Sequence, residues 1–123
     1  MIQKLEITGV HMDVDKKLHD YVTKKIGKLD HYMSRHVRES AHAEVFLKEA
    51  KIKTKKELTC EVVLHLPKDT LATKETTMNI FAAVDIVEAK LKNQLKKYKE
   101  TRSNLRIHRR VLARLRRAPQ NSL

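Results

Sequence analysis

Glycine, proline, cysteine and aromatic residues are all scarce in this chain of 123 residues. Two glycines cannot build a glycine-rich phosphate loop, and with only two prolines the chain is not a low-complexity linker. The single Cys60 cannot form an intramolecular disulfide, and its setting, LTCEVVL, predicts a buried structural thiol in a strand. No apolar run reaches the ~18 residues of a membrane span, and the N-terminus lacks the apolar region of a signal peptide. We therefore expect a cytoplasmic protein with no membrane partner.

Signatures of catalysis and of metal binding are also missing. There is no HExxH pair, no Cys/His finger, no GxSxG elbow and no nucleophile beside a base. We expect no catalytic residue, no metal ligand, no cofactor and no small-molecule substrate. His11 and His31 are interpreted as core or rim residues. None of the seven histidines has the spacing of a metal site: His11, His19, His31, His36, His42, His65 and His108.

Positive charge is what the sequence has in excess, with a formal net charge of +12. Residues 101–123 contain seven arginines and no acid, so the preceding hundred residues contribute the remaining +5. Such an excess favours a polyanionic partner, most often a nucleic acid. The alternative is a generally solvated basic surface, but the lysines are clustered rather than spread.

The stretch Thr76–Lys99 combines a buried face with a basic one. Five lysines and no acid lie between Lys90 and Lys99. Lys90, Gln94 and Lys97 share one stripe of a helix, and Lys92, Lys96 and Lys99 lie beside it on the solvent side. The apolar positions recur every three or four residues, which predicts one buried stripe: Phe81, Val84, Val87, Leu91, Leu95 and Tyr98.

Periodicity elsewhere predicts the order β-α-β-β-β-α. Helical spacing predicts a first helix over 14–32, capped by Asp13, and a second helix capped by Asn79 or Thr77. Lys48–Glu57 is predicted to be a polar, lysine-rich connection. Alternating apolar and polar residues predict strands at 2–8, 41–48, 58–66 and 71–78.

This order predicts an α/β two-layer sandwich with a four-stranded mixed sheet. The first helix must cross over between strands one and two, which makes them parallel, while hairpins make the later pairs antiparallel. Both helices then cover one sheet face and present a broad basic surface. The opposite face is expected to be polar, with Glu6, Thr59, Glu61 and His65 on it.

Two common RNA-binding modules can be excluded. An RRM needs aromatic residues on its central strands, and here only Phe46 is available; a KH domain needs a GxxG loop. What remains is recognition of RNA shape by lysines on helices, which contact phosphates without reading sequence. Such binding falls steeply with salt.

The segments YVTKKIGKLDHY and MNIFAAVDIVEAKLKNQLKKYKE, with this element order, resemble the ribosome hibernation-promoting factor / ribosome-associated inhibitor A (protein Y) family. The resemblance covers about residues 1–100. It implies a fold like the double-stranded-RNA-binding domain (dsRBD-like). It also implies binding to the small ribosomal subunit and its 16S rRNA near the decoding centre. There the protein would block messenger RNA and the A- and P-site transfer RNAs in stationary phase or stress.

Residues carried over by position are Lys24, Lys25 and Lys28 of the first helix and Lys90, Gln94 and Lys97 of the second. The resemblance implies that these contact ribosomal RNA. Lys92, Lys96 and Lys99 are added from the charge pattern alone. Asp85 matches the family's acid and is expected to organise the helix start or neighbouring basic groups.

Three positions and the C-terminal end depart from the family pattern. Phe81 replaces a common Tyr, and Asn93 replaces a common Arg. Asn79 replaces a common Asp and can still cap the helix. We expect a domain over 1–100 and a flexible, basic tail over 101–123; a tail that folds on RNA is the alternative. The chain is either a short form with a basic extension or a long form cut after its linker begins. The tail arginines that would contact RNA are Arg102, Arg106, Arg109 and Arg110.

The leading prediction is therefore a non-enzymatic ribosome-silencing factor, monomeric when free. A general RNA-binding or RNA-chaperone protein that uses the same lysines is the alternative. An RNA-modifying enzyme is a third possibility, which no residue supports.

Overall fold

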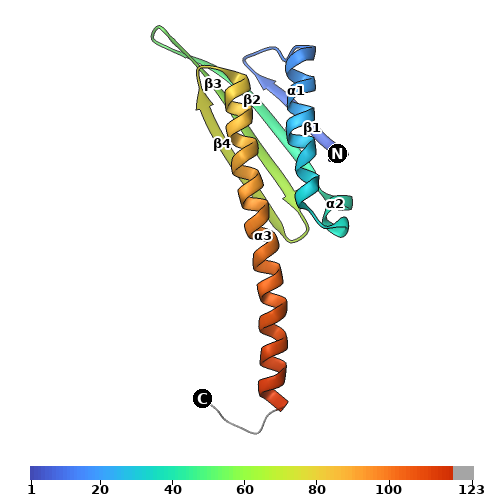
Figure 1. Cartoon of the computed structure of the whole chain (residues 1–123). Coiled ribbons are helices and arrows are strands. Elements are labelled where there is room, and N and C mark those ends of the chain that lie inside the picture. Colours follow the sequence, from blue (N-terminus) through green and yellow to red (C-terminus); the bar gives the residue numbers. More distant parts are fainter. Residues whose placement is uncertain (118–123) are drawn as a thin grey trace.

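A four-stranded sheet with its helices on one face forms the body of the molecule (Figure 1). The computed structural model describes the backbone of residues 1–117 and the side chains of residues 1–99. The strands are β1 (Lys4–Val10), β2 (His42–Ile52), β3 (Lys55–Leu66) and β4 (Asp69–Thr77). The helices are α1 (Lys16–Gly27), the 3-10 helix η1 (Lys28–Tyr32), α2 (Arg35–Ser40) and α3 (Ile80–Arg117).

The sheet order is β1-β2-β3-β4, with β1 parallel to β2 and the other pairs antiparallel. This confirms the predicted two-layer sandwich and its mixed sheet. α1 provides the crossover that a parallel pair requires, and α1 and α3 both pack on the same face. No helix within residues 1–117 is long and apolar enough to cross a membrane.

The core lies between the sheet and the two long helices. From β2 and β3 the inward positions alternate as predicted, so Val45, Cys60 and Val62 are fully buried. The predicted apolar stripe of α3 faces them, with Val84, Leu91 and other members at zero exposure. Burial, with the charge of Glu61, raises the pKa of the Cys60 thiol to about 12, so little nucleophilic thiolate exists at neutral pH.

The region predicted as one first helix over 14–32 is divided into two elements, α1 and η1. The N-cap is Asp15, whose carboxylate accepts from the Leu18 backbone N–H at 2.8 Å, and not Asp13. α1 ends at the buried Gly27, and the chain then tightens into η1. A further short helix, α2, follows with Ser34 as its cap. The other five residues of α2 are polar or charged, so Val37 is not part of an apolar stripe that would predict a helix.

The predicted connection Lys48–Glu57 is instead two arms of a long β2–β3 hairpin. The strands remain paired out to Ile52 and Lys55, and Lys53 takes the left-handed conformation (φ 59°) at the turn. The residues of this part are mostly exposed on both faces, so no hydrophobic alternation marks them. For this reason the strand ends could not be read from the pattern.

Candidate nucleic-acid interface

Lys24, Lys25 and Lys28 lie at the C-terminal end of α1 and the start of η1. Lys24 and Lys28 are exposed, whereas Lys25 is half-buried against α3. Gly27 between them is buried, and a Cβ at this position would come within 2.8 Å of the Met1 side chain. The N-terminal Met1 therefore packs against the inner side of α1 at Gly27, while Lys24 and Lys28 face outward.

Lys25 connects the two helices. Its ammonium lies 3.5 Å from a carboxylate oxygen of Asp85 and 3.8 Å from one of Glu88, both on α3. The expectation that Asp85 organises neighbouring basic groups is confirmed by this contact. Because its charge is already balanced by two acids, Lys25 has less positive charge to offer a polyanion than Lys24 and Lys28.

Tyr21 forms the second link between α1 and α3. Its hydroxyl donates to Asp85 Oδ1 at 2.5 Å, and its ring meets Phe81 edge to face with centroids 5.0 Å apart. The hydrogen bond to Asp85, then desolvation, then the charges of Asp85 and Glu88 raise the pKa of Tyr21 to about 12. Phe81, for which the resemblance implies a tyrosine, thus contributes packing to this contact.

Replacement of Tyr21 by Phe should change how stability depends on alkaline pH. Because the folded pKa of Tyr21 lies above its ordinary value of 10.0, the stabilisation from the protonated hydroxyl is complete below pH 10 and is lost as pH rises to about 12. Denaturant unfolding at a series of pH values should therefore show a smaller alkaline loss of stability in Tyr21→Phe. In the native protein a tyrosinate absorbance change near pH 12 should be present, and it should be missing from the variant. Identical titration curves would contradict the assignment.

A groove of about 530 Å³ opens beside this contact, between α1, η1 and α3. We call it the helix–helix groove. Its walls combine lysine side chains with aromatic rings, which suits phosphates and exposed bases or sugars. The lining residues are Tyr21, Lys24, Lys25, Lys28, Leu29, His31, Tyr32 and Glu88.

Lys92 and Lys96 of α3 extend the groove on its other side. Their ammonium groups lie 5.3 Å and 5.9 Å from the centre of the Tyr32 ring, which lines the groove. Lys99 follows Lys92 by seven residues and so lies on the same flank of the helix. The three lysines added from charge alone are therefore the ones that α3 turns toward α1 and η1.

Lys90, Gln94 and Lys97 lie on the other flank of α3. Lys90 forms an ion pair with Glu75 of β4, which places this flank over the sheet edge. The side-chain oxygen of Gln94 is buried and has no hydrogen-bond partner among the described residues. Lys97 is exposed. The six residues carried over from the family thus form two groups on separate flanks of the helical layer.

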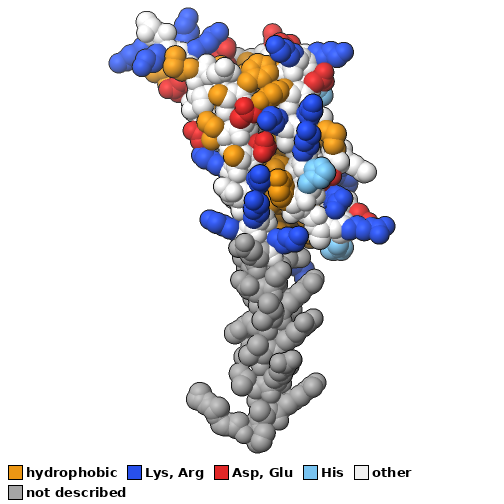
Figure 2. Space-filling model, viewed as in Figure 1, with side chains coloured by type: hydrophobic (Ala, Val, Ile, Leu, Met, Phe, Trp, Pro, Cys, Tyr) orange, Lys and Arg blue, Asp and Glu red, His pale blue; other side chains and the backbone are white. Residues whose placement is uncertain are grey.

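A further basic cluster lies at the tip of the β2–β3 hairpin, which the sequence predicted as a lysine-rich connection without a binding role. Figure 2 shows lysine and arginine side chains (blue) over the helical face and again at this tip. The cluster comprises Lys51, Lys53, Lys55 and Lys56, all exposed. The density of lysines could have identified this segment as a candidate binding surface, since residues 48–56 contain five lysines.

The predicted tail contacts, Arg102, Arg106, Arg109 and Arg110, lie outside the side chains that the structure describes. The backbone of α3 continues to Arg117, beyond the end of the predicted second helix at Lys99. The division into a domain over 1–100 and a tail stays a prediction.

Fold and groove together define the class: a two-layer α/β domain whose helical face is basic and suited to a polyanion. Residues 5–103 match the family model described as Sigma 54 modulation protein / S30EA ribosomal protein. The chain belongs to this family, which confirms the resemblance drawn from its two helices.

Comparisons with individual relatives support the family assignment. The ribosome hibernation promotion factors of Lactococcus lactis and Staphylococcus aureus are 35% and 31% identical to the chain over 101 residues, 82% of its length. The chain spans about half the length of these curated relatives, 51% and 50%. The Thermus thermophilus Protein Y N-terminal domain is 26% identical, with a TM-score of 0.65 over 76% of this chain and 94% of that one. A ribosomal subunit interface protein from Coxiella burnetii has the same fold (TM-score 0.65, 21% identity, 80% of this chain and 99% of that one).

Proposed function

We propose that the chain is a ribosome hibernation factor that binds 16S rRNA of the small ribosomal subunit near the decoding centre. There it excludes messenger RNA and transfer RNA under stress or in stationary phase. The observation that supports this most is the helix–helix groove, where lysines of α1 and α3 converge on one face of a family member whose relatives are named hibernation promotion factors. The action is occlusion rather than catalysis, and it takes place in the cytoplasm, where ribosomes are found.

The groove favours backbone recognition. Exposed ammonium groups of Lys24 and Lys28 are point charges that neutralise phosphates, and each neutralised phosphate releases counterions. Tyr32 adds an aromatic surface under Lys92 and Lys96, which orders these two long side chains before RNA arrives. The specificity for one RNA then comes from the shape that fits both helices at once.

Of the nine residues that the two helices were predicted to offer to RNA, those on the groove side are the stronger candidates. They are Lys24, Lys28, Lys92, Lys96 and Lys99. Lys90, Gln94 and Lys97 would contact RNA that passes the β4 edge of the sheet, and Lys90 would first have to leave Glu75. Lys25 acts chiefly by fixing α1 against α3.

Co-sedimentation and translation assays test the proposal. The protein should pellet with small subunits at low salt, be released as salt is raised, and slow translation in vitro. Salt sensitivity should be steep, since log affinity falls by ~0.7 to 0.9 per contacted phosphate for each unit of log salt. A general RNA chaperone using the same lysines would instead bind arbitrary duplex RNA as tightly as it binds small subunits. A protein that neither pellets with ribosomes nor slows translation would refute both the site and its function.

A further inference from the structure

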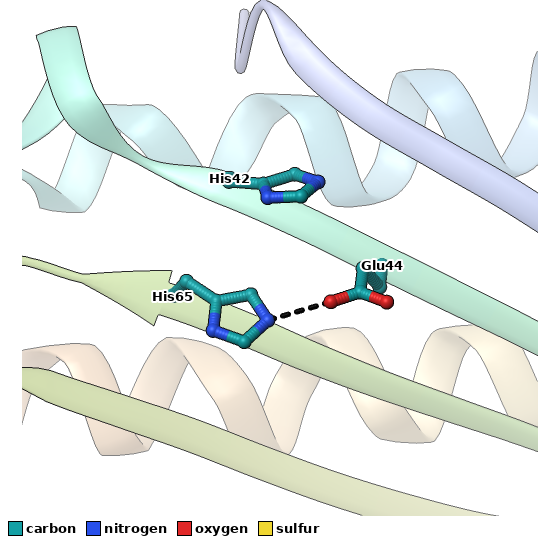
Figure 3. Close-up of side chains that lie close together, drawn as sticks. All are labelled: His42, Glu44 and His65. Atoms are coloured by element: carbon teal, nitrogen blue, oxygen red, sulfur yellow. Dashed lines mark hydrogen bonds and ion pairs between the residues drawn. The ribbon is translucent and has the colours of Figure 1, made fainter.

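Three potential metal ligands meet on the sheet face that the helices leave open. His42 and Glu44 are two residues apart on β2, so both side chains point to the same face, opposite to buried Ala43 and Val45. His65 of β3 is the direct cross-strand partner of His42. Figure 3 shows the three side chains on this face, with the helices behind the sheet.

Their donor atoms are close enough to share one ion. One nitrogen of each histidine and one carboxylate oxygen of Glu44 lie within 4.8 Å of one another. His65 Nε2 is already 2.7 Å from Glu44 Oε1, and the two imidazole rings are 5.4 Å apart between centroids. Ligand atoms on a common metal ion at ~2.0 to 2.2 Å are separated by ~3 to 3.5 Å, so small side-chain rotations suffice to close the set.

The donor set selects the kind of ion. Two imidazoles and one carboxylate suit a borderline divalent transition metal such as Zn²⁺, whereas Ca²⁺ and Mg²⁺ need mostly oxygen ligands. All three residues are half-buried, so water can fill the fourth position. Glu6 of β1, 4.0 Å from His42 Nε2, is placed to orient that imidazole from outside the ligand set.

We propose that His42, Glu44 and His65 form a zinc-class metal site on the open face of the sheet. The site links β2 to β3 and lies on the opposite side of the sheet from the helix–helix groove, so it stands independently of the proposed ribosome binding. It also departs from the expectation of no metal ligands. Helical and finger motifs have fixed spacings along the sequence, whereas two ligands on neighbouring strands have no fixed spacing.

The proposal is tested by measuring the Zn²⁺ affinity of the full chain near neutral pH. Calorimetric titration gives the stoichiometry, and competition with a metal-indicator chelator gives the affinity. Wild type should bind one ion, and its unfolding midpoint should rise with Zn²⁺ concentration. His65→Ala and His42→Ala should each weaken the affinity on the order of tenfold or more. His36→Ala, which removes an exposed histidine of α2, should bind like wild type.

Glu44→Gln separates metal binding from the hydrogen bond to His65. The amide can still pair with the imidazole, so the fold is preserved, but it is a poorer ligand and Zn²⁺ affinity should fall with the unfolding midpoint in chelator unchanged. Equal Zn²⁺ affinity for wild type and for His42→Ala with His65→Ala, or no Zn²⁺-dependent shift in wild type, would overturn the proposal. In that case Glu44 and His65 form only an ion pair.

Discussion

Lys24→Glu combined with Lys28→Glu is expected to weaken binding to small ribosomal subunits on the order of a hundredfold at low salt. Both side chains are exposed and line the helix–helix groove, so they are free to contact phosphate and their reversal should not disturb the core. Reversal removes two favourable charges and adds two that repel the RNA backbone. In the neutral version, Lys24→Ala with Lys28→Ala, the slope of log affinity against log salt should fall by ~2 units.

The matched control is Lys4→Glu with Lys74→Glu. It changes the net charge by the same amount. However, Lys4 of β1 and Lys74 of β4 are exposed, and they pair with His42 and Glu61, whose side chains lie on the open sheet face. Only a few-fold effect is expected from the loss of long-range attraction. Lys90→Glu with Lys97→Glu, on the other flank of α3, then reports whether the β4 edge is also in contact. Equal losses in the groove variant and the open-face control would mean that net charge, and not the groove, determines binding.

Leu91→Ala should lower the free energy of unfolding by ~2 to 5 kcal/mol. Leu91 is fully buried in the middle of the α3 stripe, where the helix packs on β3 and β4, so the truncation leaves a cavity in a core of modest size. The position of α3 relative to α1 depends on this packing, so groove binding should weaken in proportion to the unfolded or loosened fraction.

Urea unfolding followed by circular dichroism measures this effect, with Ile86→Ala as the control. Ile86 lies on the same helix, loses a side chain of similar size, and is 38% exposed, so its truncation should cost less than about 1 kcal/mol. If Leu91→Ala were as stable as Ile86→Ala, the assignment of the buried stripe would be wrong.

The fold could be predicted largely because its core is strictly periodic. Cys60, Val62 and Leu64 are buried at every second position of β3, and the apolar residues of α3 recur at helical spacing. Both the element types and the buried faces could therefore be predicted. The parallel β1–β2 pair followed from the need for a crossover. Elements with little or no buried face were missed, as with the outer arms of the β2–β3 hairpin and the whole of α2.

The sequence named lysines of the helix–helix groove as candidate RNA contacts, but it did not predict how they are arranged. Helical spacing correctly places Lys92 and Lys96 on one stripe of α3 and Lys90 on another. Which stripe faces α1 depends on how the buried face is rotated onto the sheet, and the contacts with Tyr32 and Glu75 reveal it. The sequence pattern does not determine that rotation.

The His42–His65 pair was unpredictable for a related reason. Cross-strand partners depend on where the hairpin turns, and a polar connection drawn from Lys48 to Glu57 leaves the register of β2 on β3 open. The turn at Lys53 sets this register and brings the two histidines opposite each other.

Competition for the small subunit tests the central claim most directly. Small subunits are loaded with messenger RNA and transfer RNA, or left empty, and pelleted at low salt with wild-type protein or with Lys24→Glu, Lys28→Glu. Occlusion through the helix–helix groove predicts that wild type pellets with empty subunits, is excluded from loaded ones, and that the groove variant pellets with neither. Equal pelleting of wild type with empty and loaded subunits would contradict it.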